Sequence, residues 1–565
     1  MTRCEESRDG PRSDRSTTPE LYNTIVGSIT NGLNGLHLHN GAAQELDALI
    51  VGAGFGSVYQ LKHLRDAGYK VKLVEAGGDY GGVWYWNRYP GARVDSSVPA
   101  YEFSDPALWK TWSRQQRFPA SAELRAYFAH VADVWDLRRD TEFGAFVESA
   151  VWGDGEARWT IKTKKGDIYK AKFFLLNTGF AAKRYIPDWK GIETFQGTFL
   201  HPSYWPHEGL DLKGKKVAVI GTGSTGAQLA ADLTPLVGEL AVFQRSINTS
   251  MPMRQVDYQD GEQEIPRDDY PDFYRGRTDR FGGFDFSFLG RSTFDDDAEK
   301  RRETYEKLWA SGDFKFWLTT YQDMLHTTFG GTKARAKIHD ARVRDLLAPM
   351  KQPYWLGCKR VSLENGYFEI FNESHVHLVD VNSTPIEAIT PKGIKTSEKE
   401  WEFDYIICAT GFDSLTGGLK QMDIRGPSGQ SLAEHWEEAT YTHLGLSVSG
   451  FPNMLFSYGP QAPTPFCNGP TCAQLQGDWI LGLMNHMRDK GLKKVEAEEE
   501  SEKKWRDLVL EIANATLLPA AHSWYMGDNI PGKPREPLVY LGGVPAYYKT
   551  LGETAENGYT GFKLE

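Results

Sequence analysis

The sequence is poor in cysteine, has no long apolar run and carries no excess of basic charge. Its five cysteines are few and odd in number, which suits a reducing compartment in which the thiols stay free. No apolar run reaches the ~18 residues that a bilayer-spanning helix needs, so we expect no membrane partner. The net charge of −11 argues against non-specific binding to nucleic acid.

The N-terminus lacks the features of a targeting segment. It has no apolar stretch of the kind that secretory signals carry. It contains Glu5, Glu6, Asp9 and Asp14, whereas organelle transit peptides are poor in acids. We therefore expect a cytoplasmic protein with an N-terminal extension over residues 1–44, of which residues 1–18 form a disordered tail.

Two stretches of the chain share one local pattern, and the composition is that of a soluble globular protein of two or three domains. Each stretch has an apolar run, then a glycine-rich turn, then a helix-like run. They are Leu46–Leu64 and Lys215–Leu233. Because this β-α-β pattern cradles the phosphates of a dinucleotide, the sequence predicts two dinucleotide sites.

The first glycine turn runs from Gly52 to Ser57 and reads GAGFGS. Gly52 permits the tight turn, and Gly54 lets the backbone approach a pyrophosphate at the helix N-terminus. The third fingerprint position is Ser57, and its small side chain should preserve close packing of the helix against the strand. Glu75 ends the next expected strand, where its carboxylate can bind a ribose diol.

The second glycine turn, Gly221–Gly226, matches the full G-x-G-x-x-G fingerprint. After the following strand, Arg245 and Ser246 stand where the first unit has an acid. An arginine can grip a ribose 2′-phosphate that a carboxylate would repel, so this turn favours NADP over NAD. One acid-ended and one arginine-ended turn together predict FAD plus NADPH, with hydride passing from nicotinamide to flavin.

Three longer motifs accompany these turns. Residues 195–206 read F-x-G-x-x-x-H-x-x-x-W-P. Residues 81–95 read G-G-V-W, four residues, Y-P-G, three residues, D. Residues 523–535 contain S-W-Y-M-G and N-I-P-G-K-P-R. In these motifs and their order, the chain from about residue 45 to 565 resembles the type I Baeyer–Villiger monooxygenases.

The resemblance implies an NADPH- and O2-dependent enzyme that converts ketones to esters or lactones. In such enzymes NADPH reduces FAD, O2 adds at flavin C4a, and the peroxyflavin attacks the ketone to give a Criegee adduct that rearranges. Two rival functions stay open, namely a flavin monooxygenase that oxidises S or N atoms and an uncoupled NADPH oxidase. The Trp205-Pro206 ending argues against the first rival, whose fingerprint lacks it.

The resemblance also assigns roles to single residues. Arg360 corresponds to the active-site arginine beside the flavin, whose charge would stabilise the oxyanions of the reaction. Asp95 corresponds to its carboxylate partner, and the retained pair argues against a catalytically silent dinucleotide sensor. Arg245 and Lys359 would bind the 2′-phosphate, and Trp524 would contact NADP.

The complete expected site combines the turns with the resemblance. His201, the histidine of the 195–206 motif, would couple the domains rather than perform acid–base chemistry. No metal ligands are expected. The expected cofactor-binding residues are Gly52, Gly54, Phe55, Gly56, Ser57, Glu75, Val83, Trp84, Tyr85, Trp86, Asp95, Tyr101, Thr222, Gly223, Ser224, Thr225, Gly226, Arg245, Ser246, Lys359, Arg360 and Trp524.

These observations predict an α/β fold with two Rossmann-like dinucleotide-binding domains, for FAD and NADP, and an inserted helical subdomain. We expect Asp404–Thr410 to form a strand that completes the first sheet. The expected ranges are 45–180 and 405–565 for the FAD domain, 181–249 and 351–404 for the NADP domain, and 250–350 for the helical insertion.

Ser57 and residues 460–470 depart from the family pattern. Ser57 replaces the usual third glycine. Residues 460–470, with Phe466 and several prolines, occupy the place of a substrate-lining loop that varies within the family. The substrate preference of another member therefore does not carry over to this chain. A ketone and O2 are the expected small-molecule partners, and a monomer is the expected state.

Overall fold

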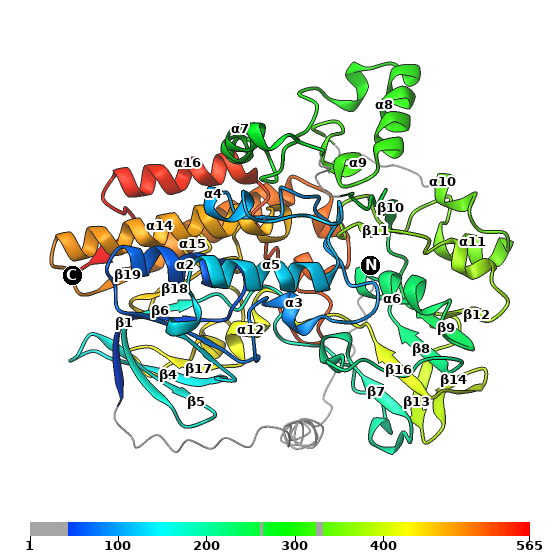
Figure 1. The fold of residues 1–565 in the computed structure, drawn as a ribbon, viewed down its shortest axis with the longest axis horizontal. Coiled ribbons are helices and arrows are strands. Elements are labelled where there is room, and N and C mark those ends of the chain that lie inside the picture. Colours follow the sequence, from blue (N-terminus) through cyan, green and yellow to red (C-terminus); the bar gives the residue numbers. More distant parts are fainter. Residues whose placement is uncertain (1–42, 260–263, 324–331) are drawn as a thin grey trace, which may run out of the picture. The chain divides into compact units, whose positions relative to one another are not determined.

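The computed structural model describes residues 43–259, 264–323 and 332–565 (Figure 1). The expected disordered tail over residues 1–18 lies outside the described residues. Within these three ranges, no helix combines the length and the apolarity needed to cross a membrane.

The first sheet is built around β1 (Gln44–Val51). β1 pairs in parallel with β2 (Val71–Glu75) on one side and with β6 (Ile168–Leu176) on the other. The helix α2 (Phe55–Asp66) joins β1 to β2 and packs against both strands. This is the first predicted β-α-β unit, and its glycine turn lies at the carboxyl end of β1, where parallel sheets bind ligands.

The complete first sheet has the strand order β17-β4-β5-β6-β1-β2-β3, and β18 also pairs with β6. β18 (Met454–Phe456) lies parallel to β6, so a strand from the C-terminal part of the chain does join this sheet. The remaining strands are β3 (Thr141–Phe143), β4 (Val147–Gly153), β5 (Arg158–Thr163) and β17 (Asp423–Arg425).

The second sheet is wholly parallel, with the order β12-β9-β8-β16-β7. Its second and third strands flank α6 in the chain and form the second predicted β-α-β unit. The elements are β7 (Thr198–Leu200), β8 (Lys216–Ile220), α6 (Ser224–Leu233), β9 (Glu239–Gln244), β12 (Val376–Asp380) and β16 (Tyr405–Cys408).

The placement of β16 corrects one expectation. We expected Asp404–Thr410 to complete the first sheet, but β16 pairs with β8 on one side and β7 on the other, both in the second sheet. A short apolar run predicts a buried strand but carries no signal for the sheet that it joins. The neighbouring strands decide this, and they are distant in sequence.

Residues 250–350 contain the helices α7 to α11. α8 (Ala298–Ser311) begins after Asp297, whose side chain accepts a hydrogen bond from the Lys300 backbone N–H. α11 (Ala341–Leu347) begins in the same way after Asp340, whose side chain accepts a hydrogen bond from the Val343 backbone N–H. The other helices are α7 (Tyr270–Gly276), α9 (Lys315–Leu318) and α10 (Thr332–Arg335), and β10 (Ser250–Pro252) pairs with β11 (Ser362–Glu364).

The C-terminal part supplies three long helices, drawn in orange to red in Figure 1. α14 (Gly469–Asp489) packs against both α2 and α16 (Gly543–Glu556), and α15 is Glu499–Asn514. The remaining elements are α3 (Val83–Trp86), α4 (Pro106–Trp109), α5 (Ser121–Val134), α12 (Gly417–Lys420), α13 (Leu432–His435), β13 (Ile386–Thr390), β14 (Gly393–Thr396), β15 (Glu400–Glu402), β19 (Val495–Ala497) and β20 (Phe562–Leu564).

Candidate functional site

The first glycine turn forms a backbone cradle. Gly52 has a φ of +100°, and a Cβ at this position would lie 2.6 Å from the carbonyl oxygen of Asn177. Gly82 has a φ of +53°, and its Cβ would lie 2.8 Å from the Gly54 Cα. A Cβ on Gly54 would meet, among the described residues, only the Gly82 Cα at 3.6 Å. The backbone at Gly54 therefore stays accessible to a ligand.

The start of α2 is suited to an anion. α2 begins directly after Gly54, and no side chain in the described ranges caps its first turn. Its first N–H groups therefore remain available, and the helix dipole favours negative charge there. Ser57 is fully buried, as close packing of α2 requires, and a Cβ on Gly56 would lie 2.8 Å from the Ser457 Oγ.

Glu75 lies beside this cradle at the end of β2 and is 5% exposed. Its Oε1 accepts a hydrogen bond from the Gly77 backbone N–H at 2.6 Å. Burial raises the pKa of Glu75, and hydrogen bonds from the backbone of Gly77 and Ala53 and from Trp86 oppose that rise. A carboxylate held next to the glycine turn is the arrangement that ribose recognition requires.

Aromatic side chains gather at the start of α2. The Trp84 indole N–H donates to the Tyr101 hydroxyl at 3.1 Å. The Tyr101 ring centroid lies 5.1 Å from that of Phe55, the first residue of α2. Tyr85 is buried, whereas Val83 is 40% exposed. The structure therefore brings Phe55, Trp84 and Tyr101 together at the first turn and leaves Val83 at the surface.

The second glycine turn has the same design. Gly221 has a φ of +114°, and a Cβ there would collide with the Ala409 carbonyl oxygen. A Cβ on Gly226 would collide with the carbonyl oxygen of Gly221. By contrast, a Cβ on Gly223 meets no described atom within 4 Å. Gly223 precedes α6, whose first turn no described side chain caps, so this position too is open to a phosphate.

Hydroxyl groups hold the second turn in place. The Thr222 hydroxyl donates to the Ser246 carbonyl oxygen at 2.8 Å. The Ser224 Oγ is hydrogen-bonded to the Ser362 Oγ at 2.8 Å. The Tyr89 hydroxyl donates to the Thr225 Oγ1 at 3.3 Å. These contacts fix the turn against three other segments of the chain, which preorganises it for a ligand.

Arg245 and Lys359 lie close to each other at the end of β9. Arg245 and Ser246 follow β9 directly and are exposed. Burial and then the positive charge of Arg245 lower the pKa of Lys359, while Asp528 raises it. The Lys359 Nζ lies 4.6 Å from the ring centroid of Tyr354. Two cations that repel each other across an exposed strand end suit a doubly charged phosphate.

The expected ion pair between Arg360 and Asp95 is present. The Arg360 Nε and Nη2 donate to the Asp95 Oδ2 at 3.0 and 2.8 Å. The Arg360 Nη1 donates to the Pro465 carbonyl oxygen at 2.6 Å. Burial by itself lowers the pKa of Arg360, but Asp95 outweighs this, so the pKa lies above its ordinary value. The guanidinium is therefore always charged, and it is held from two sides.

Several aromatic rings lie near this pair. The Phe314 ring centroid lies 5.1 Å from the Arg360 Cζ. Burial raises the pKa of Tyr525, and the charge of Arg360 opposes that rise, so the two side chains are neighbours. Phe466 lies 5.1 Å from Tyr525 and 5.5 Å from Trp317 between ring centroids. These residues come from three distant segments, and only Phe466 carried a sequence signal, its place in the 460–470 loop.

His201 is buried and neutral. Its Nε2 donates to the Gly411 carbonyl oxygen at 3.0 Å, so Nδ1 is the acceptor that faces the Ser203 hydroxyl at 2.8 Å. Burial lowers the pKa of His201 to about 4. Ser203 also accepts a hydrogen bond from Arg184, whose guanidinium lies over the ring of Trp86 in α3. His201 thus belongs to a chain of contacts that runs from Gly411, beyond β16 of the second sheet, to α3, which follows β2 of the first sheet.

Trp524 lies in the 523–535 segment and stacks on Phe180, with ring centroids 5.5 Å apart. Lys533 of the same segment donates to the Asp413 carboxylate at 2.8 Å, and Asn529 donates to the Phe412 carbonyl oxygen at 2.8 Å. The segment is therefore fastened to the turn that follows β16, at the carboxyl end of the second sheet.

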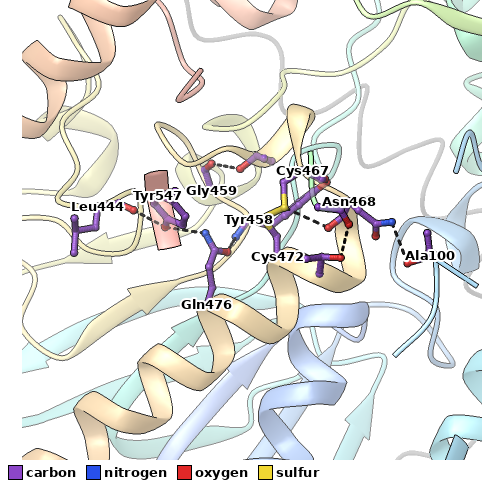
Figure 2. The surroundings of a disulfide bond; sticks show 12 residues. Ala100, Leu444, Tyr458, Gly459, Cys467, Asn468, Cys472, Gln476 and Tyr547 are labelled. Carbon is purple, nitrogen blue, oxygen red and sulfur yellow. Dashed lines mark hydrogen bonds between the residues drawn. A yellow bond between two sulfur atoms is a disulfide. The ribbon is translucent and has the colours of Figure 1, made fainter. Parts of the chain in front are cut away.

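Cys467 and Cys472 form a disulfide at the start of α14 (Figure 2). The expectation of free thiols is wrong for this pair, whereas among the other described cysteines Cys358 and Cys408 are free and buried. Sequence spacing did not predict the bond, because pairing depends on how the chain enters α14 at Asn468, where the two Cα atoms come to lie 6.1 Å apart. The bond joins the 460–470 loop to the first turns of this helix.

The two cradles fit FAD and NADPH. Each has an uncapped helix N-terminus and a glycine backbone that a ligand can approach. The first has the buried acid Glu75 at the end of its second strand, and the second has Arg245 with Lys359 near it. The charges therefore match a ribose diol at one site and a 2′-phosphate at the other.

Known proteins resemble this chain over nearly its whole length. A family model described as pyridine nucleotide-disulphide oxidoreductase matches residues 46–255. Cyclopentanone 1,2-monooxygenase from Comamonas sp. is 43% identical over 537 residues, which cover 94% of this chain and 98% of that protein. A Baeyer–Villiger monooxygenase from Pseudooceanicola batsensis is 33% identical over 528 residues, which cover 91% of this chain and 96% of that protein. The crystal structure of OTEMO in complex with FAD and NADP matches with a TM-score of 0.88 at 33% identity, over 93% of this chain and 100% of that one.

Proposed function

The chain belongs to the Baeyer–Villiger monooxygenases, and from this premise we propose which of its residues carry the reaction and which ketones it accepts. It is a flavin-dependent oxidoreductase with two Rossmann-like domains that uses NADPH and O2 to convert ketones to esters or lactones. Once bound and reduced by NADPH, FAD would activate O2 so that one oxygen atom is inserted beside the carbonyl carbon.

The Arg360–Asp95 pair carries the proposal for the catalytic residues. Arg360 is charged at every working pH, and Asp95 and the Pro465 carbonyl hold its guanidinium in one place. We assign to Arg360 the stabilisation of the negative charge that develops on the ketone oxygen, because a fixed charge needs no reorganisation when the reaction occurs. Asp95 positions the guanidinium, and the ring of Phe314 covers one side of it.

The cofactor sites are assigned on the same basis. Gly54 and α2 would hold the FAD pyrophosphate and Glu75 its ribose, with Trp84 and Tyr101 beside them. Gly223 and α6 would hold the pyrophosphate of NADPH. The residues that would bind the 2′-phosphate are Arg245, Ser246 and Lys359, and Trp524 would contact the same nucleotide.

The sheet topology supports a domain division with one revised boundary. We propose that the FAD domain comprises residues 45–180 and the chain from about residue 411 to 565, in place of a start at 405. The NADP domain comprises residues 181–249 and the chain from 351 to the end of β16. The strand pairing of β16 motivates the revision, and residues 250–350 remain the proposed helical insertion.

Small cyclic ketones are the proposed substrates. The relative named cyclopentanone 1,2-monooxygenase shares 43% of its residues with this chain over almost its full length. Phe314, Phe466 and Trp317, near Arg360, give the surroundings of the guanidinium an apolar character that suits a ketone without charged groups. Cyclopentanone is therefore the first ketone to test, followed by cyclohexanone and by aryl-alkyl and long-chain ketones.

A ketone panel with NADPH in air tests this proposal. Product masses and peroxide release are measured in the same samples. A product heavier by one oxygen atom, with little peroxide, is expected for cyclopentanone. NADPH consumption matched by peroxide for every ketone would indicate the uncoupled oxidase instead. A sulfide and an amine in the same panel test the rival that oxidises S or N atoms, and their exclusive oxidation would favour it.

We also propose a monomer in the cytoplasm. The two free, buried thiols of Cys358 and Cys408 are compatible with a reducing compartment. Sedimentation of the purified protein tests the oligomeric state, and a dimer at all concentrations would refute the monomer. Fractionation of the source cells tests the compartment, and recovery of the protein outside the cytoplasm would refute that assignment.

A further inference from the structure

The Cys467–Cys472 disulfide lies next to the proposed reaction site. Pro465, whose carbonyl accepts the hydrogen bond from Arg360, stands two residues before Cys467. The Cys467 carbonyl accepts a hydrogen bond from the Tyr458 hydroxyl at 2.8 Å, as Figure 2 shows. The Asn468 amide donates to the Ala100 carbonyl at 3.0 Å. The disulfide thus closes residues 467–472 into a ring, and Pro465, which contacts Arg360, lies two residues before that ring.

Both sulfur atoms are shielded from bulk solvent. Cys467 is 4% exposed and Cys472 is fully buried. A large reductase has no direct access to them. Hydrogen peroxide is much smaller, and when it forms in the adjoining site it is already inside the protein surface that covers the two sulfur atoms. Burial by itself favours the thiol form at these two positions as well, but Cys472 lies in the first turns of the 21-residue α14, whose dipole favours a thiolate.

The other described cysteines provide a contrast. Cys358 and Cys408 are both fully buried and carry no disulfide. Burial raises the pKa of the Cys358 thiol to about 12 and also raises that of Cys408. They stay in the unreactive thiol form at neutral pH. Only the pair at the start of α14 combines two neighbouring sulfurs with a helix N-terminus within the described ranges.

We propose that Cys467 and Cys472 are a redox-active pair that hydrogen peroxide from uncoupled turnover oxidises from the dithiol to the disulfide. A thiolate sulfur attacks one peroxide oxygen, the O–O bond breaks, and a sulfenic acid and hydroxide form. The second thiol then attacks the sulfenic sulfur, forming the S–S bond and releasing water. In sum, two thiols and one H2O2 give one disulfide and two H2O, and NADPH, H⁺ and O2 supply the peroxide.

The expected consequence is a change in how firmly the loop holds Arg360. In the disulfide form, Cys467 is tied covalently to Cys472 in the first turns of α14, and the Pro465 carbonyl, two residues earlier, is kept against the guanidinium. In the dithiol form that tie is lost, so the Pro465 carbonyl is held less firmly, while the contacts of Arg360 with Asp95 and Phe314 remain. Oxidation by escaped peroxide would then restore coupling, a feedback of use in a compartment where disulfides are usually transient and redox-sensing. This inference rests on the proposed role of Arg360.

Thiol mapping of the reduced holoenzyme tests the pair. The protein is reduced, freed of reductant, and incubated with NADPH in air without ketone. Remaining thiols are blocked, and peptides are quantified by mass spectrometry. The 467–472 disulfide should accumulate with peroxide release while Cys358 and Cys408 remain thiols. If the disulfide formed at an equal rate without NADPH, or if the dithiol persisted with NADPH, the proposal would be overturned.

Failure of the proposed function is recognised in the same samples. Absence of NADPH consumption would count against the function and not against the cysteine pair. Hydrogen peroxide added to the reduced protein then tests the pair directly. Oxidation of Cys467 and Cys472 ahead of Cys358 and Cys408 supports the inference, and indifference of the pair to peroxide overturns it.

Variants test the effect on coupling. Cys472→Ser, and separately the reduced wild-type protein, should release about threefold more peroxide per NADPH than the oxidised protein. Cys4→Ser, which changes a cysteine outside the described residues, is the matched control and should leave the ratio unchanged. FAD content checks that each variant is folded. An unchanged ratio for both the variant and the reduced wild type would overturn the link to Arg360.

Discussion

At the scale of single residues, the most informative contact joins Arg360 to Asp95, which are 265 positions apart in the chain. Two N–H groups of one guanidinium converge on a single carboxylate oxygen, and a backbone carbonyl takes a third donor. The carboxylate keeps the arginine charged in a half-buried position where burial alone would weaken the charge. A positive charge that neither titrates nor moves is suited to an oxyanion that exists only during the reaction.

Arg360→Ala tests this role. The variant should retain FAD and still oxidise NADPH, because the residues assigned to both nucleotides are otherwise unchanged. Ester formation should fall by about 10³-fold, since a preorganised charge near a developing oxyanion is lost. Arg425→Ala removes a partly exposed arginine that is paired with Asp423 at 2.9 Å and serves as the control. Ester yield equal to that of the control would remove Arg360 from the mechanism.

Arg245→Ala tests the phosphate assignment. The KM for NADPH should rise by about 10-fold to 100-fold, because a charge-assisted contact with the 2′-phosphate is lost. The KM for NADH, which has no such phosphate, should stay nearly constant and so provides an internal control. Steady-state kinetics with both nucleotides measure the change, and an unaltered ratio of the two constants would refute the assignment.

At the scale of elements, the two β-α-β units use glycine in two different ways. Gly52 and Gly221 adopt positive φ and face carbonyl oxygens, so their role is to let the chain turn. Gly223 has extended backbone angles that any residue adopts, with φ −69° and ψ −174°. A Cβ there would meet no described atom within 4 Å, so no contact inside the described fold explains a glycine at this position. A ligand that approaches the backbone does explain it.

The pair of variants Gly223→Ala and Gly221→Ala separates these roles. Gly223→Ala should fold with an unchanged melting temperature but raise the KM for NADPH by about tenfold, because the methyl group occupies the space of the pyrophosphate. Gly221→Ala should lose about 1–3 kcal/mol of stability through backbone strain and the contact with Ala409. Calorimetry and kinetics on both variants check this. Normal NADPH affinity in folded Gly223→Ala would refute the cradle.

At the scale of the whole molecule, buried neutral histidines link different parts of the chain. His201 binds the Gly411 carbonyl beyond β16, and burial lowers its pKa to about 4 from an ordinary 6.5. Burial likewise lowers the pKa of His443, beside the C-terminal segment, to about 4. Both histidines therefore stay neutral in the folded protein under conditions in which an unfolded chain would begin to protonate them.

Acid should therefore destabilise the fold in a defined window. Because the folded pKa lies below the unfolded value, the unfolded state binds protons first as the pH falls. The contribution of His201 is fully present above about pH 6.5 and is lost progressively towards pH 4, up to about 3 kcal/mol. His201→Gln keeps an N–H donor and cannot titrate, so its melting temperature should fall less steeply with acid. If the melting temperature fell equally steeply with pH in the variant and the wild type, this prediction would be contradicted.

The sequence by itself determined the local units of this protein. Apolar runs that end in glycines predicted both β-α-β units, and Glu75 and Arg245 at the strand ends predicted the two kinds of nucleotide. The F-x-G-x-x-x-H-x-x-x-W-P motif and the segments around Asp95 and Trp524 indicated the family, which the relatives confirm. Such features are readable because turn geometry and strand burial depend on neighbours in the chain.

Only the tertiary structure decided which distant segments meet. It placed β16 in the second sheet, brought the Pro465 carbonyl and the ring of Phe314 to Arg360, and joined Cys467 to Cys472. Local sequence predicts that a short apolar strand is buried, yet its partner depends on the strands that flank it in space. For the same reason, the sequence around Pro465 does not indicate that its carbonyl oxygen accepts a hydrogen bond from Arg360. The packing of the whole chain sets these contacts, since each needs two segments that sequence order keeps far apart.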